Sequence, residues 1–319
     1  MTSGDEGPSE ASELCDQRDE QASLRRIANS MPKEKWYHYT DVHGLRGIID
    51  RAELWGTHTA FLNDSQELAY GVEVLAQLVN RRASEMNLFT QGENGTRRMH
   101  PMVSLWQSMD ASIKGLKDQL AYDLAPFVSC LSRSRDQLSQ WRGYGRGGGY
   151  AIRFNSNKLC DSIRQVDSDR RDVVGGPKPV IERVAYVKQN FKDHIEIAVA
   201  KFLREITVED IDYEVAHAAF VDTVIDLASR MKDRAFQEEQ ETRIICRGRE
   251  TFHSPSSNLG LIPRVTLRFK RSAVREVIVG PSEYADVRRL SVERYLKEHP
   301  SGKYAHVKVT SSAIPYRDI

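Results

Sequence analysis

The sequence has little cysteine, and its cysteines are widely spaced. The 319 residues contain Cys15, Cys130, Cys160 and Cys246, which form no CxxC motif. No Cys/His spacing typical of zinc occurs either, which argues against a zinc-binding domain. We therefore expect free thiols in a reducing compartment and no metal site.

Long apolar runs and an excess of one charge are also missing. No apolar run approaches the ~20 residues that a membrane helix needs. Lys and Arg number 46 against 45 Asp and Glu, so the formal net charge is +1. This balance gives no general attraction to nucleic acid or to an anionic membrane. Since the polar, acidic N-terminus is the opposite of a secretory signal, we expect a cytoplasmic protein that does not bind membranes.

Three common catalytic motifs do not occur. The sequence has no GxSxG, no HExxH and no GxxxxGK[ST], and its histidines lack metal-ligand spacing. The lipase, metalloprotease and P-loop classes therefore have no support.

The sequence does contain enough apolar residues, 40%, for a sizeable core. Residues 1–30 are expected to be a disordered acidic tail, because seven carboxylates fall within residues 1–20. Residues 31–319 are expected to form a single α+β domain with a helical insertion at about 190–233. The order of elements lacks regular βαβ alternation, which favours α+β over a doubly wound sheet.

Hydrophobic periodicity places the expected elements along the domain. Helices are expected over 42–54, 65–83, 102–121 and 285–299, with two more in the insertion. Strands are expected over 35–40, 54–62, 126–132, 149–154, 180–187, 241–248, 264–269, 274–280 and 305–310.

His38 is the first candidate for chemistry. In WYHYT, alternation places His38 on one face of a strand and Tyr37 and Tyr39 on the other. A histidine there can hydrogen-bond a sugar hydroxyl. A core histidine bonded to a backbone carbonyl is the alternative, and the sequence leaves both open.

The second candidate is QWRGYG, at 140–145. Trp141 and Tyr144 on a glycine-flanked turn either fill the core or stack on a planar ligand. The glycine run that follows allows backbone amides to approach an anion, although a hairpin connection has the same composition. Arg142, Arg146 and Arg153 could hold a pyrophosphate by forked hydrogen bonds, or could lie on a solvated surface.

The third candidate is FQEEQETR, which leads into a strand. On an extended segment Glu239, Glu241 and Arg243 share one face. Two carboxylates and an arginine are hard to bury unless they pair or bind a ligand. A solvent-facing ladder of ion pairs is the alternative.

These stretches, in this order, resemble a widespread bacterial family of uncharacterised domains. The resemblance rests on HYT with GLRGII, LND with SQE, SQWRGYG with GYAIRF, FQEEQETR, and the final SSAIPYR with Arg317. It spans roughly residues 35–318. That family is distantly similar to ADP-ribosyltransferases, and it also resembles some bacterial toxin and phage-defence proteins.

The resemblance implies a bent or split β core, with surrounding helices, that holds NAD as a substrate in a cleft. His38 matches the first-strand histidine and would bond a ribose hydroxyl. Glu241 matches the catalytic glutamate of a late strand, and Glu239 would orient the acceptor. The side chains expected to contact NAD are Trp141, Tyr144, Arg142, Tyr39 and Arg243, with Tyr70 as a substitute for the stacking aromatic.

Several functions stay open at this point. With water as acceptor the enzyme would be an NAD glycohydrolase, and with a protein or nucleic acid it would be a transferase. A non-catalytic nucleotide-binding or regulatory module of the same fold is an alternative. A nucleic-acid-processing defence protein and a structural interaction protein are others.

Overall fold

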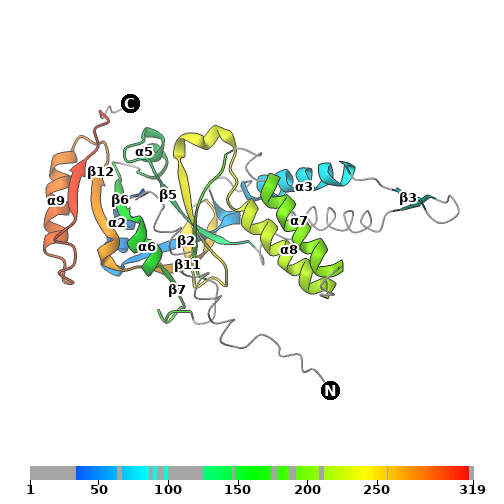
Figure 1. The fold of residues 1–319 in the computed structure, drawn as a ribbon. Helices are drawn as coiled ribbons and strands as arrows, with labels where there is room; N and C mark the ends of the chain where they lie inside the picture. Colours follow the sequence, from blue (N-terminus) through cyan, green and yellow to red (C-terminus); the bar gives the residue numbers. More distant parts are fainter. Residues whose placement is uncertain are drawn as a thin grey trace, which may run out of the picture.

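The computed structural model describes residues 34–62, 67–85, 89–91, 97–99, 125–145, 148–173, 178–186, 192–207, 212–256 and 258–315. Within these ranges a large mixed sheet carries helices on its faces, and a group of long helices stands at one side (Figure 1). The expected α+β class is confirmed. The expected acidic tail and the expected helix over 102–121 lie outside the described residues.

A strand, a short helix and a second strand open the described chain. The alternating segment KWYHYT forms β1 (Lys35–Thr40). Asp41 caps α2 (Val42–Arg51), because its carboxylate accepts a hydrogen bond from a first-turn amide at 2.8 Å. Ala52 ends the helix in left-handed backbone with φ 57°, and β2 (Glu53–His58) begins at the next residue. The helix therefore ends three residues before the expected limit.

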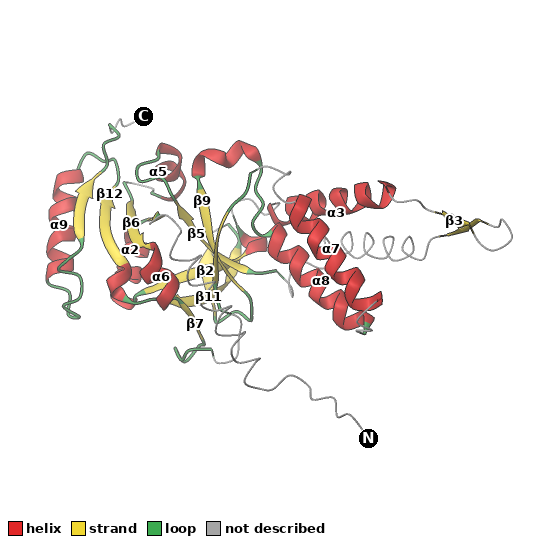
Figure 2. Cartoon of the chain, viewed as in Figure 1, coloured by secondary structure: helices red, strands yellow, loops and turns green. Residues whose placement is uncertain are grey.

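The other elements follow in chain order (Figure 2). The strands of the main sheet are β5 (Phe127–Ser132), β6 (Tyr150–Asn155), β7 (Arg164–Val166), β8 (Val180–Arg183), β9 (Glu241–Cys246), β10 (Phe252–Ser256), β11 (Gly260–Arg268), β12 (Val274–Val279) and β13 (Lys308–Ser311). The helices are α3 (Glu67–Glu85), α5 (Leu138–Tyr144), α6 (Ser156–Ser162), α7 (Lys192–Thr207), α8 (Tyr213–Ala228) and α9 (Ala285–Lys297), with 3-10 turns η1 (Thr59–Phe61), η3 (Arg234–Glu239) and η4 (Arg271–Ala273).

Short elements account for most differences from the expected pattern. β7, β10 and α6 were not expected, since three to seven residues give too few repeats for a periodicity to be seen. The small hairpin of β3 (Phe89–Gln91) and β4 (Arg97–Met99) was not expected either.

The sheet divides at β5. β9 pairs with β5 along its whole length, ending at Ser132↔Glu241. On the other edge, β2 pairs with β5 only at Phe127 and Val128, and β1 only at Tyr37↔Ser132. β2 leads on to β11 and β10, while β1 leads on to β6, β12 and β13. Between these two pairings, no described strand covers this edge of β5.

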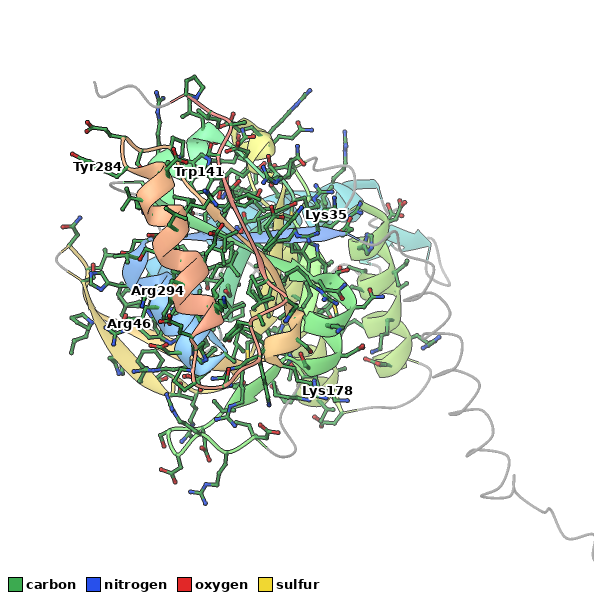
Figure 3. The ribbon with its side chains drawn as sticks, turned by 90° about the vertical axis from the view of Figure 1, so that its left-hand side faces the viewer. Lys35, Arg46, Trp141, Lys178, Tyr284 and Arg294 are labelled. Carbon is green, nitrogen blue, oxygen red and sulfur yellow. The ribbon has the colours of Figure 1, made fainter. Side chains whose placement is uncertain are left out.

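Two separate hydrophobic cores hold the elements together. The main core lies between the sheet and α2, α6 and α9. Figure 3 looks onto α9, where Tyr284 precedes the helix and Arg294 lies in its last turns. The second core is formed largely by α3, α7 and α8, and the last two helices lie within the expected insertion. No helix in the described ranges is both long and apolar enough to cross a membrane.

Replacing Gly71 by alanine is expected to destabilise the helical group. An added Cβ at Gly71, in α3, would lie 2.6 Å from the Ala228 carbonyl oxygen, at the end of α8. We expect a loss of roughly 1–3 kcal/mol of unfolding free energy, measured by chemical denaturation. Gly47→Ala in α2 is the control, because nothing lies within 4 Å of its new Cβ. The control should gain up to about 1 kcal/mol. Equal stability of Gly71→Ala and wild type would contradict this close contact between α3 and α8.

Candidate functional site

Glu241 lies in a buried network of charged side chains at the start of β9. Only 4% of the residue is exposed. Its Oε1 accepts a hydrogen bond from Arg243 Nε at 2.8 Å, and its Oε2 accepts from Arg243 Nη2 at 3.1 Å. Lys232 Nζ also donates to Oε2, at 3.2 Å. We call Lys232, Glu239, Glu241 and Arg243 the Glu241 cluster.

Local structure before β9 brings Glu239 into this cluster. η3 ends at Gln240, whose left-handed backbone (φ 45°) turns the chain into the strand. The Glu239 carbonyl accepts a hydrogen bond from the Ser132 hydroxyl at 2.8 Å, which anchors the turn on β5. The Glu239 carboxylate then accepts from Lys232 Nζ at 2.6 Å. One buried lysine therefore bridges both glutamates of the Glu-x-Glu segment.

The cationic partners keep Glu241 ionised. Burial alone would raise the pKa of Glu241, but the charge and hydrogen bonds of Arg243, the charge of Lys232 and a hydrogen bond from the Cys130 thiol lower it to about 2. Glu239 keeps one fifth of its side chain exposed. It is therefore the more accessible of the two carboxylates.

Tyr144 is a partly exposed aromatic residue influenced by the charges of the cluster. It is the last residue of α5 and is 39% exposed. Burial raises the pKa of the Tyr144 hydroxyl, and the nearby Cys130, Glu239 and Glu241 raise it further. The Tyr144 hydroxyl therefore lies within electrostatic range of both carboxylates, while part of the residue faces solvent.

Trp141, the other aromatic of the turn, belongs to the core. It is 5% exposed, and its ring packs edge-on against Tyr39 with centroids 4.7 Å apart. Its indole N–H donates to Asp136 at 2.7 Å. Asp136 also accepts hydrogen bonds from the Ser312 hydroxyl and the Ala313 amide, at 2.6 and 2.7 Å. The C-terminal SSA segment is thus attached to α5, and the indole is enclosed by protein.

The glycines around this ring are explained by close packing. An added Cβ at Gly280 would lie 2.9 Å from the Trp141 ring, and one at Gly149 would lie 2.3 Å from the Gly145 Cα. Only glycine permits these approaches without a shift of backbone or ring. Packing therefore accounts for Gly145 and Gly149 in the glycine run.

His38 contacts β5 next to the single pairing of β1 with β5, at Tyr37↔Ser132. Its Nδ1 lies 3.0 Å from the Cys130 carbonyl oxygen, and the residue is half-buried. Burial lowers the pKa of His38 below 6.5, with the Cys130 carbonyl opposing the shift. Tyr37 pairs with Ser132, and Ser132 pairs with Glu241, so these three side chains lie on one face of the sheet. His38 is next to Tyr37 in β1, and its side chain therefore projects from the opposite face to Glu241. Cys130 links the two sides, with its carbonyl toward His38 and its thiol toward Glu241.

The remaining expected NAD contacts are dispersed. Arg142 is exposed on α5, and Arg243 is almost completely buried, with Nη1 donating to the Ser229 carbonyl at 2.8 Å. The Tyr39 hydroxyl donates to the Ser134 carbonyl at 2.8 Å. Tyr70 packs against the helical core. In the described part of the chain, no three His, Cys, Asp or Glu side chains are grouped as a metal site would require.

Three further residues of the site were not among the candidates. Lys232 lies beyond the end of α8, Cys130 lies in β5, and the Tyr186 hydroxyl accepts a hydrogen bond from the Glu241 amide at 2.8 Å. Burial raises the pKa of Tyr186 to about 12. Nothing in the local sequence of these residues indicates that they meet Glu241, because each comes from a different element.

A family model described as a protein of unknown function (DUF2971) matches residues 140–244. The match begins in α5 and ends in β9, so it includes Tyr144, Glu239 and Glu241 but not His38. Searches of curated proteins and of solved structures gave no match.

Acid is expected to remove the stabilisation that Glu241 provides. Its pKa is 4.5 as an ordinary glutamate and about 2 in the fold. A lowered pKa stabilises the fold fully above pH 4.5, and this contribution is lost as the pH falls toward 2. The difference in unfolding free energy between wild type and Glu241→Gln should therefore shrink by about 3 kcal/mol over that range.

The measurement is chemical denaturation at several pH values between 5 and 2. Glu238→Gln is the control, because Glu238 is an exposed neighbour. The difference in unfolding free energy between wild type and Glu238→Gln should stay nearly constant over this pH range. A Glu241→Gln difference that is equally independent of pH would show that the carboxylate is not held ionised by its partners.

Proposed function

We propose that this protein acts on the N-glycosidic bond of NAD, as an ADP-ribosyltransferase or NAD glycohydrolase. The observation that supports the proposal is the convergence on Cys130 of three distant segments. His38 comes from β1, Tyr144 from the end of α5, and Glu241 from the start of β9, where Lys232 joins it to Glu239. The resemblance noted in the sequence assigns roles in NAD chemistry to the same segments.

In this proposal Glu241 supports the reacting ribose. Breaking the bond between C1′ and the nicotinamide nitrogen leaves positive charge on the ribose, and nicotinamide departs with the electron pair. An ionised carboxylate stabilises that charge and orients the ribose 2′-hydroxyl, which contributes about a hundred- to thousandfold in rate. Water or an acceptor nucleophile then bonds to C1′ and loses a proton, and Glu239 is placed to orient this acceptor.

His38 is suited to a hydrogen bond with a ribose hydroxyl. Because burial lowers its pKa, the imidazole is neutral near pH 7. With the Nδ1 proton directed to the Cys130 carbonyl, Nε2 keeps a lone pair that can accept from a hydroxyl. A ligand that reaches both His38 and Glu241 must enter the gap where β1 and β5 part.

Tyr144 is the accessible aromatic for nicotinamide. The residue is partly exposed and within electrostatic range of both carboxylates, whereas the Trp141 ring is enclosed. An aromatic face can stack on the pyridinium and fix the orientation of the glycosidic bond. Arg142, exposed two residues earlier, is free of the core and available for phosphate oxygens.

A non-catalytic nucleotide-binding module is a second candidate, favoured by one observation. Both oxygens of Glu241 already accept hydrogen bonds from Arg243 or Lys232. A carboxylate neutralised in this way is typical of a structural ion pair. In that case NAD or a related nucleotide would bind without release of nicotinamide.

The test is nicotinamide release from NAD by the purified full chain, with and without cell extract as a source of protein and nucleic-acid acceptors. Glu241→Gln should lower turnover about a hundred- to thousandfold. Tyr144→Ala should raise KM, while Tyr144→Phe keeps the ring and should stay near wild type. Loss of the second carboxylate in Glu239→Gln should reduce transfer to acceptors more than hydrolysis.

Glu238→Gln is the matched control, because it removes an exposed carboxylate next to the cluster. Folding of Glu241→Gln must be verified at the assay pH, since Arg243 and Lys232 lose a buried partner in that variant. NAD binding without nicotinamide release would support the second candidate. If the protein neither binds NAD nor releases nicotinamide from it, both candidate functions are contradicted.

A further inference from the structure

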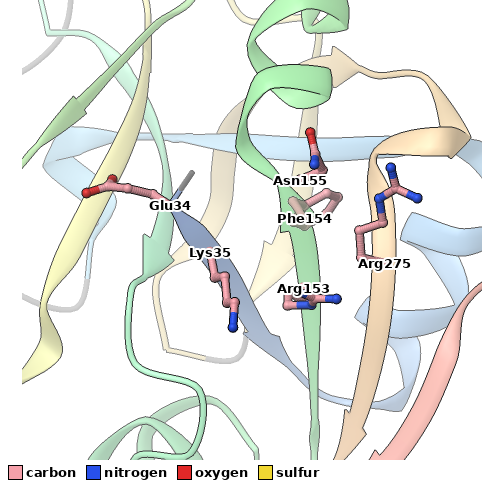
Figure 4. A pocket seen from close by; sticks show the side chains of 6 residues that line it. All are labelled: Glu34, Lys35, Arg153, Phe154, Asn155 and Arg275. Carbon is pink, nitrogen blue, oxygen red and sulfur yellow. The ribbon is translucent and has the colours of Figure 1, made fainter. Parts of the chain in front are cut away.

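A second polar site lies on the sheet away from the Glu241 cluster. A pocket of about 410 Å³ opens over β1, β6 and β12 (Figure 4). Its lining residues are Glu34, Lys35, Arg153, Phe154, Asn155 and Arg275. None of them belongs to the Glu241 cluster, so the site is independent of the proposed function.

Backbone register explains why cationic side chains line this pocket. Lys35 pairs with Asn155 and Tyr37 with Arg153, so Lys35, Arg153 and Asn155 share one face of the sheet. The pairing of β12 with β6 shifts register between Val274 and Glu276. Arg275 is the extra residue of this irregularity, and a bulge of this kind re-aims a side chain.

The acidic side chains near the pocket are already engaged. Glu34 forms an ion pair with Arg183 and accepts a hydrogen bond from the Trp36 indole at 3.0 Å. Its carboxylate points away from the pocket in Figure 4. Glu276 lies 3.1 Å from Arg153 Nε but also accepts from Arg135 Nη2 at 3.0 Å. A single carboxylate thus serves two guanidinium groups.

The pocket therefore carries uncompensated positive charge. Among the described residues, neither Lys35 nor Arg275 forms an ion pair. Placing like charges around one hollow is unfavourable unless an anion occupies it. Guanidinium groups offer forked donors that match phosphate oxygens, and the volume falls in the range of small-molecule sites.

We propose that this pocket binds the phosphate of a small phosphorylated molecule, held by Lys35, Arg153 and Arg275 with Asn155 as a neutral partner. A nucleic-acid backbone is the less favoured occupant, because the chain has a formal net charge of only +1 and the site is a single hollow. Phosphate and pyrophosphate groups share the chemistry that the pocket recognises.

The experiment is isothermal titration of the full chain with inorganic phosphate, pyrophosphate, ADP and adenosine. Pyrophosphate and ADP should bind, and adenosine, which has no phosphate, should not. Lys35→Gln and Arg275→Gln should each weaken pyrophosphate binding about tenfold. Lys178→Gln and Arg51→Gln are the controls, because they remove exposed cations elsewhere, and binding should be unchanged.

Two further results decide the matter. Tighter binding of ADP than of pyrophosphate would support a nucleotide as the ligand, and equal binding would support recognition of the phosphate group alone. The proposal is overturned if none of the three phosphate compounds binds, or if binding is insensitive to both pocket substitutions. A parallel titration with a single-stranded oligonucleotide tests the other occupant, and the proposal is also overturned if only the oligonucleotide binds and Arg275→Gln abolishes that binding.

Discussion

The buried ion pair between Glu241 and Arg243 is the interaction on which the rest of the site depends. An arginine that is 2% exposed is tolerated because the Glu241 carboxylate and the Ser229 carbonyl accept its hydrogen bonds. Arg243 joins β9 to the Ser229 carbonyl beyond α8, and Lys232 extends the same network to Glu239. The charges therefore connect the helical group to the sheet, and they also set the position and ionisation of the candidate catalytic carboxylate.

The division of the sheet at β5 allows a backbone carbonyl to bind a side chain. β1 and β2 share one edge of β5, and neither covers its middle. The Cys130 carbonyl on this edge interacts with His38 instead of a neighbouring strand. In a sheet with continuous strand pairing, this carbonyl would accept a hydrogen bond from a backbone amide of the next strand. Cys130 therefore interacts with the His38 imidazole through its carbonyl and with the Glu241 carboxylate through its thiol, although the two side chains lie on opposite faces of the sheet.

One row of paired residues connects the two polar sites. Glu241, Ser132, Tyr37, Arg153 and Glu276 lie opposite one another on five neighbouring strands. Their side chains therefore share one face of the sheet, and three strand spacings, or ~14 Å, separate the Glu241 backbone from the Arg153 backbone. The buried Tyr37 residue lies in the row between them, so the Glu241 cluster and the pocket lined by Lys35, Arg153 and Arg275 are separate sites.

The sequence alone determined the α+β class, β1, the start of α2 and the residue types from which a site could be made. Periodicity and capping act within a few residues, so they are visible in the chain itself. Only the tertiary structure decided that Trp141 packs in the core while Tyr144 stays accessible, and that Lys232 bridges two glutamates. These outcomes depend on strand register and on partners such as Cys130, which is 92 residues from His38. No local pattern encodes such a separation, because burial and pairing are properties of the packed chain.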